Sequence, residues 1–185
     1  MPLSGSSWVS KFPTSTDVED LIPPFRDNVK RFLAALKAAG AAVTISATYR
    51  PPERAFLMAY AFSIAREGLS PAKVPNNPAI DIDWVYRYAN GRINYAASRK
   101  AAEEMVVGYD IAFKPALSSQ HTRRLAIDIT VSWPGTMNIL DAQGKNVAIT
   151  SLPRSGSNSD LIAVGATYQV IKLIADPPHW SVDGH

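Results

Sequence analysis

Histidine is the side chain whose number and placement in this sequence best suit metal chemistry. The sequence has three histidines, at positions 121, 179 and 185. His121 precedes Asp128 by seven residues, and His179 follows Asp176 by three. Two imidazoles and one carboxylate can hold a divalent ion and leave one coordination position open, while a further carboxylate can handle protons. These residue types predict a hydrolytic site with one zinc ion.

The composition of the chain narrows the classes of site and partner. The 185 residues include no cysteine, which excludes a thiolate metal site, a cysteine nucleophile and disulfides. The net charge of +3 weakly favours an anionic partner, but no basic run beyond Arg123-Arg124 supports nucleic-acid binding. No apolar run approaches the roughly 18 residues of a membrane span, so we expect no membrane partner. Residues 1–16 are polar, which argues against a signal peptide.

Hydrophobic periodicity predicts the secondary structure. Apolar residues from Phe25 to Leu36 recur at helical spacing, and Gly40 marks the end of that helix. Ser159 is the expected N-cap of the last helix. The expected elements are a helix over 25–39, a strand over 43–48, a helix over 51–67, a helix over 95–108, a strand over 125–131, a hairpin of 137–140 with 147–149, and a helix over 160–174.

These elements predict an α+β fold, in which helices pack against a small, mainly antiparallel sheet. Residues 69–94 are rich in proline and asparagine, so we expect a long loop there. Within it, Ile80 and Ile82 alternate with aspartates as in a brief strand. We expect an irregular arm over residues 1–20 and one catalytic domain over residues 21–185, and we expect the protein to be a monomer.

Asp128 is the acidic residue of an otherwise apolar strand. Alternation places Ala126, Asp128 and Thr130 on one face of this strand and the isoleucines on the other. A carboxylate among apolar residues is costly unless it is paired or bound to a cation. The loop before the strand can fold His121 back over Asp128. An ordinary ion pair and a surface histidine remain an alternative for each residue taken alone.

The stretch from Asp176 to Trp180 is the second candidate segment. Two prolines separate Asp176 from His179, so the backbone is extended or turned there rather than helical. The two side chains are therefore expected to keep a fixed relation. Trp180 is expected to wall off the site or to stack on a substrate. A helix exit followed by a tryptophan of the core is the alternative.

Three motifs occur together in one order along the chain. They are Ala47-Thr48-Tyr49-Arg50-Pro51, Ser119-x-His121-x6-Asp128 and Asp176-x-x-His179-Trp180-Ser181. The combination resembles the zinc peptidases that include D-alanyl-D-alanine carboxypeptidases, vancomycin-resistance dipeptidases and phage L-alanyl-D-glutamate endolysins. The resemblance covers the chain from about residue 43 to its end. This chain departs from the family at Arg124-Leu125, where glycine is frequent.

The resemblance implies a role for each matched residue. The zinc ligands would be His121, Asp128 and His179, and Asp176 would be the catalytic acid and base. Arg50 would face the substrate carbonyl. The remaining matched residues, expected at the substrate, are Ser119, Trp180 and Tyr49.

These roles make chemical sense together. Three protein ligands leave zinc a water whose pKa falls toward ~7. Asp176 would take the proton of that water and pass it to the leaving amine. Zinc would polarise the scissile carbonyl, and Arg50 would stabilise the developing oxyanion.

The expected function is hydrolysis of peptidoglycan stem peptides, with the L-alanyl-D-glutamate bond as the first candidate. Without a signal peptide, such an endolysin would remain in the cytoplasm until it is released to the cell wall, unless it is exported in another way. A D,D-carboxypeptidase or dipeptidase of the same family is an alternative. A non-catalytic wall-binding or virion module is another. An iron(II) oxygenase triad also uses two histidines and a carboxylate, but its first histidine and acid are usually about two residues apart.

Overall fold

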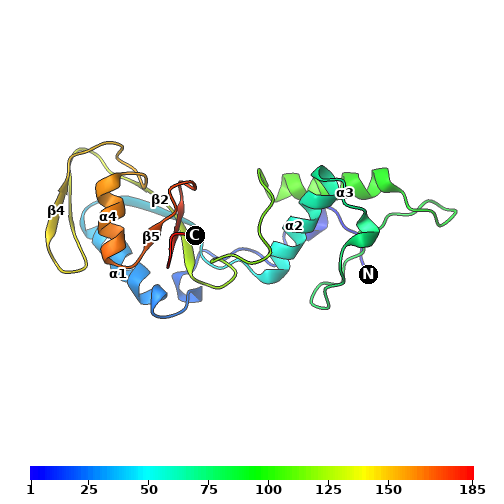
Figure 1. The fold of residues 1–185 in the computed structure, drawn as a ribbon, viewed down its shortest axis with the longest axis horizontal. Coiled ribbons are helices and arrows are strands. Elements are labelled where there is room, and N and C mark those ends of the chain that lie inside the picture. The colour runs from blue at the N-terminus through cyan, green and yellow to red at the C-terminus, as the bar shows by residue number, and fades with distance from the viewer. The chain divides into compact units, whose positions relative to one another are not determined.

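The computed structural model describes residues 1–185, which form two compact units rather than one domain after an arm (Figure 1). The helical unit comprises Met1–Pro13 and Pro51–Ser118, and the sheet unit comprises Thr14–Arg50 and Ser119–His185. Each unit encloses its own hydrophobic cluster. Residues 1–20, expected as an arm, are divided between the two units, and residues 21–185, expected as one catalytic domain, contribute to both.

The helical unit is built around two helices, α2 (Pro52–Arg66) and α3 (Tyr95–Gly108), which pack on each other. The N-terminal segment contributes the short 3₁₀-helix Ser6–Trp8, and the Trp8 side chain is buried in this core. Residues 69–94 contain one further 3₁₀-helix, Pro71–Lys73. The apolar side chains of this core come from all these segments: Trp8, Leu57, Ala61, Ile64, Ile80, Ile82, Trp84, Ala102, Met105, Val106 and Tyr109.

The segment expected as a long loop is anchored at its centre. Ile80, Ile82 and Trp84 are buried while Asp81 is exposed, as the alternation predicted. The brief strand is reduced to a single bridge between Leu3 and Asp83. The N-terminal residues thus cover this loop, which explains why they do not form a free arm.

The sheet unit contains a four-stranded antiparallel sheet, which confirms the expected α+β class. Its strand order is β1-β2-β6-β5. The bounds of the four strands are β1 Ala42–Ala47, β2 Ala126–Ser132, β5 Ile171–Lys172 and β6 His179–Ser181.

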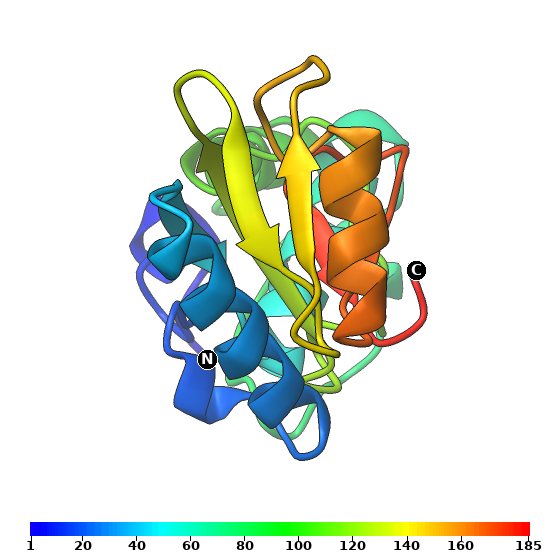
Figure 2. The ribbon, with the colours of Figure 1, turned by 90° about the vertical axis from the view of Figure 1, so that its left-hand side faces the viewer.

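Two helices and a hairpin complete this unit. The hairpin of β3 (Met137–Leu140) and β4 (Asn146–Ile149) lies between α1 (Phe25–Ala38) and α4 (Ser159–Thr167) (Figure 2). Gly40 follows α1 with a φ of 79°, a left-handed conformation that lets the chain turn back into β1.

The core of the sheet unit lies on one face of β2. Ile127, Ile129 and Val131 point into it, whereas Asp128 and Thr130 lie on the opposite face. This alternation confirms the two faces that the sequence predicted for the strand. The buried core is completed by Leu21, Phe25, Val29, Phe32, Leu36, Trp133, Met137, Ile139, Ile149, Leu161, Val164, Tyr168, Val170 and Trp180.

The last helix is shorter than the sequence indicated. It ends at Thr167 instead of Ile174, because Gln169 has a left-handed φ of 60° and the following residues form β5. Its N-cap is Asn158 rather than Ser159. The Asn158 side chain accepts hydrogen bonds from the amides of Asp160 and Leu161, which is the usual capping geometry.

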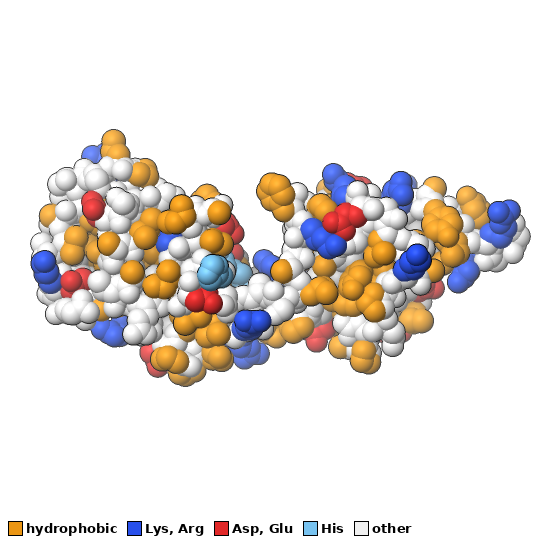
Figure 3. Space-filling model, in the orientation of Figure 1, with side chains coloured by type: hydrophobic (Ala, Val, Ile, Leu, Met, Phe, Trp, Pro, Cys, Tyr) orange, Lys and Arg blue, Asp and Glu red, His pale blue; other side chains and the backbone are white.

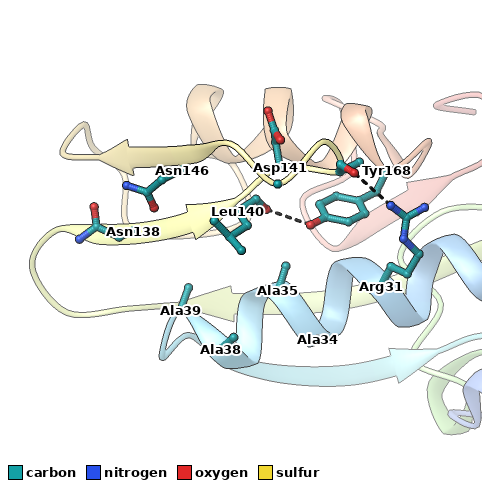
Figure 4. Close-up of a pocket in the computed structure, with 12 residues that line it drawn as sticks. Arg31, Ala34, Ala35, Ala38, Ala39, Asn138, Leu140, Asp141, Asn146 and Tyr168 are labelled. Atoms are coloured by element: carbon teal, nitrogen blue, oxygen red, sulfur yellow. Dashed lines mark hydrogen bonds between the residues drawn. The ribbon is translucent and has the colours of Figure 1, made fainter.

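The sheet unit also has a cavity of about 610 Å³ between α1 and the hairpin (Figure 4). Alanines of α1 form one side of it, and Asn138, Leu140 and Asn146 form the other. None of the residues predicted to do chemistry lines this cavity. No helix of either unit combines the length and the hydrophobicity needed to cross a membrane.

Candidate metal centre

Three side chains predicted to bind metal converge in the sheet unit. His121 Nε2 lies 3.0 Å from Asp128 Oδ1, and His179 Nδ1 lies 3.0 Å from the same oxygen. The two imidazole nitrogens are 3.1 Å apart. One ligand atom from each residue therefore faces a common point, and the group could hold a metal ion. His121 and His179 are themselves buried, and histidine atoms are visible beside acidic ones on one face of this unit (Figure 3).

Strand register explains why residues so distant in sequence meet. Asp128 of β2 pairs directly with His179 of β6 and also with Ala47 of β1. Directly opposed residues of antiparallel strands have Cβ atoms roughly 4.5–5.5 Å apart, so their side chains reach each other. The register shift at the end of β1 lies beside this site, where bulges commonly re-aim side chains.

His121 is oriented by the chain that follows β1. Its Nδ1 lies 2.8 Å from the main-chain oxygen of Thr48. Since a carbonyl oxygen only accepts hydrogen bonds, Nδ1 carries the hydrogen and neutral His121 presents a lone pair at Nε2. Thr48 is itself fixed, because its hydroxyl donates to the oxygen of Asp17 at 2.8 Å.

His179 is oriented in the same way by the segment that follows β6. Its Nε2 lies 3.1 Å from the main-chain oxygen of His185, which can only accept, so neutral His179 presents a lone pair at Nδ1. Ser181 holds this turn, because its hydroxyl accepts from the amides of Gly184 and His185. The His185 imidazole takes no part in the group.

The donor set fits a metal ion. His121 Nδ1 and His179 Nε2, the outer nitrogens, donate to main-chain oxygens. The atoms that face one another, His121 Nε2, Asp128 Oδ1 and His179 Nδ1, are then three lone-pair donors within hydrogen-bond distance. Such a group repels itself unless protons or a cation lie between its members. Histidine ligands whose second nitrogen donates to a carbonyl are the arrangement that protein metal sites use to fix the tautomer.

Protons occupy the same point when no metal is bound, and the pKa shifts describe that state. Burial raises the pKa of Asp128, but hydrogen bonds from His121 and His179 outweigh it and hold the pKa well below its usual range. Burial lowers the pKa of His179, but the hydrogen bond with Asp128 and the negative charges of Asp128 and Asp176 outweigh it and raise the pKa.

The stability of the metal-free protein should therefore depend on pH in a definite direction. The lowered pKa of Asp128 gives stability that is lost as pH falls below the unfolded value near ~3.9. The raised pKa of His179 gives stability that is fully present below about 6.5 and is lost as pH rises through the folded value. Thermal unfolding of chelator-treated protein should show the midpoint falling between pH 6 and 8.

A bound metal ion should reverse this trend, because metal requires deprotonated ligands and its affinity rises with pH. The control is therefore the metal-loaded protein in the same buffers. If the midpoint of thermal unfolding changed with pH in the same way in both forms, no ion would compete with protons for these three side chains.

Asp176 and Arg50, the residues expected to act on the substrate, both belong to the same unit. Asp176 lies in the exposed turn before β6, and its negative charge reaches His179. Its main-chain oxygen accepts from the amide of His179 at 3.1 Å. Arg50 is half-buried just after β1, and its amide donates to the main-chain oxygen of His121 at 3.3 Å.

Tyr49 and Ser119 both contact the loop that carries His121, Tyr49 through Arg124 and Ser119 through Thr122. The Tyr49 ring lies under the guanidinium of Arg124, 4.2 Å from its central carbon. Arg124 has a left-handed φ of 65°, so the loop adopts the glycine-type conformation at this position without a glycine. The Thr122 hydroxyl accepts a hydrogen bond from the amide of Ser119 and donates one to the main-chain oxygen of Ser119. These two bonds close the turn that contains His121.

Trp180 does not wall the site, contrary to the expectation. Its side chain is fully buried and packs on Phe32, with ring centroids 5.4 Å apart. Because residues alternate along β6, Trp180 points to the face opposite His179. A Cβ on Gly165 would lie 2.6 Å from the Trp180 ring, so the tryptophan fills the space that this glycine leaves. Trp180 is a core residue.

Two residues at the site were missed by the sequence analysis. Thr48 belongs to the motif Ala47-Thr48-Tyr49-Arg50-Pro51. The motif did not indicate that the main-chain oxygen of Thr48 would contact His121. Lys172 gave no signal, because the sequence placed it in the last helix, where a lysine is usually a surface residue. It is buried, and its ammonium group contacts the main chain around Asp176 and His179.

Comparison of the chain with models of known protein families, with curated proteins and with solved structures gave no match.

Proposed function

We propose that this protein is a zinc-dependent peptidase that hydrolyses the stem peptides of peptidoglycan. The observation that carries the proposal is the convergence of three lone-pair donors, each histidine having its outer nitrogen fixed on a main-chain oxygen. Two nitrogens and one carboxylate oxygen suit zinc, and three protein ligands are typical of catalytic rather than structural sites. The order and spacing of the three motifs support the choice of substrate.

Zinc, when bound there, supplies a Lewis acid and an acidified water. Asp176 accepts a proton from the attacking water as its oxygen bonds to the carbonyl carbon, and returns that proton to the amine nitrogen as the peptide C–N bond then breaks. Arg50 stabilises the negative charge that develops on the carbonyl oxygen. The hydrogen bond from the amide of Arg50 to the main-chain oxygen of His121 holds Arg50 next to this zinc ligand.

Several features of the sheet unit support this division of roles. Asp128 lies on β2, an inner strand of the sheet, and its Oδ1 contacts both histidines, which suits a ligand. Asp176 is exposed and makes no side-chain hydrogen bond, so its carboxylate remains available to water and substrate.

Digestion of purified peptidoglycan by the zinc-loaded protein tests this proposal. Mass spectrometry of the products should reveal peptides with a new amino-terminal D-glutamate, which is the product of L-alanyl-D-glutamate cleavage. Release of single D-alanine residues would instead identify a carboxypeptidase. Sedimentation of the protein with the wall and no new termini would identify a binding module and overturn the proposed hydrolysis.

A further inference from the structure

Lys172 carries a buried charge that the proposed reaction does not use. The residue lies in β5 and is only 6% exposed. A lysine is rarely buried unless its ammonium group is paired. Here its partners are main-chain oxygens of the chain segment that follows it.

The ammonium group of Lys172 is surrounded by three carbonyls. Its Nζ lies 2.6 Å from the oxygen of Leu173 and 3.1 Å from the oxygen of His179, and it also donates to the oxygen of Asp176. An ammonium has three hydrogens, so each one has a carbonyl. All three oxygens belong to the loop 173–179.

Each of these carbonyls also accepts one main-chain amide. The amide of Asp176 donates to the oxygen of Leu173, that of His179 to the oxygen of Asp176, and that of Leu173 to the oxygen of His179. The three amide bonds and the three ammonium bonds together form a closed network. Lys172 is its centre, because no other group contacts all three oxygens.

The same loop carries His179 and Asp176. Two prolines within it lack amide hydrogens, so the loop makes few main-chain hydrogen bonds of its own. Its conformation depends on the bonds just described and on one from the amide of Ile129 in β2 to the oxygen of Pro178, at 2.9 Å. A displacement of about 1 Å at a reacting group can reduce a rate by about a hundredfold.

We propose that Lys172 is a positioning residue, whose ammonium group gathers the three carbonyls of loop 173–179 and thereby fixes His179 Nδ1 and the Asp176 carboxylate relative to Asp128. The part that concerns Asp176 rests on the proposed function. The part that concerns His179 rests only on the metal-binding group.

Lys172→Met tests the proposal, because methionine keeps much of the apolar stem and removes the charge. We expect metal affinity, measured by chelator competition with Zn²⁺ and Co²⁺, to weaken by about 10- to 100-fold, as for other groups that orient ligands. The visible absorption of the Co²⁺ form should change, and kcat should fall more than KM rises. Lys145→Met, at an exposed turn, is the matched control and should leave all readouts unchanged.

A chemical rescue separates the charge from the fold. The chain has no cysteine, so Lys172→Cys introduces a unique thiol. In the unfolded protein, its thiolate displaces bromide from 2-bromoethylamine and forms a thioether that ends in an ammonium at the lysine position. After refolding, this product should recover most of the metal affinity. The uncharged S-propyl product of 1-bromopropane should not.

Lys172→Arg provides a further arm, because a planar guanidinium cannot direct its hydrogens at three converging oxygens. It should bind metal at least about tenfold more weakly. Wild-type metal affinity and Co²⁺ absorption in Lys172→Met or Lys172→Arg, or equal affinities of the aminoethyl and propyl products, would overturn the proposal. These metal readouts decide the matter even if the unmodified protein cleaves no peptidoglycan, which would count against the proposed function alone.

Discussion

Asp176→Asn should reduce the turnover of peptidoglycan peptides by about 10²- to 10⁴-fold, the range for loss of a general acid and base. Asparagine has nearly the same shape, but its amide cannot accept the proton of the attacking water. The contact with Lys172 uses the main-chain oxygen of Asp176, so the loop should keep its conformation. The metal content should therefore stay unchanged.

The measurement pairs product quantification by mass spectrometry with elemental analysis of the same sample. Asp27→Asn is the matched control, because Asp27 is exposed on α1 and its only ion pair is with the adjacent Arg26. Full turnover in Asp176→Asn would remove Asp176 from the mechanism. Loss of metal in that variant would instead make Asp176 a ligand.

His179→Ala should empty the metal site. The binding energy of about 10–16 kcal/mol typical of a structural zinc, shared among four ligands, amounts to roughly 3 kcal/mol each, or a loss on the order of a hundredfold in affinity. The variant also leaves His121 and Asp128 as an ordinary pair. Elemental analysis after dialysis should show close to one metal ion per chain in the wild type and almost none in the variant.

His185→Ala is the control for the loss of a histidine. The site uses the main-chain oxygen of His185, and alanine retains that oxygen. This variant should keep its metal. Equal loss of metal in both variants would mean that the His185 imidazole contributes to binding, and equal retention would mean that the ion lies elsewhere.

The metal-binding group could be predicted from sequence because its members obey local rules. Asp128 stood out as a charge in an apolar alternation, and the two prolines before His179 excluded a helix. Their meeting depends on the β2–β6 register, which hydrophobic periodicity alone does not give. The sequence also predicted seven of the helix and strand positions closely.

The errors arose where distant contacts decide the structure. The N-terminus belongs to the helical unit because Leu3 forms a bridge with Asp83 and Trp8 is buried in the core. No pattern within residues 1–20 predicts these contacts. Trp180 could face either side of its strand until the position of Phe32 was known. The last helix ends before Gln169, which has a left-handed φ. Residues other than glycine seldom adopt this conformation, so the sequence contained no indication of it.

Lys172 illustrates the same limit for function. Its side chain is buried only because a loop seven residues long folds back over it and offers three carbonyls. The sequence placed Lys172 in the last helix, where a lysine usually faces solvent. The role of the Lys172 charge therefore follows from its three carbonyl partners, which only the three-dimensional structure identifies.

Anomalous diffraction from crystals of the zinc-loaded protein, collected on both sides of the zinc absorption edge, would locate the metal ion. We expect one peak within about 2.0–2.2 Å of His121 Nε2, His179 Nδ1 and an Asp128 carboxylate oxygen. Absence of a peak at this point, with the three side chains instead sharing protons, would contradict this expectation.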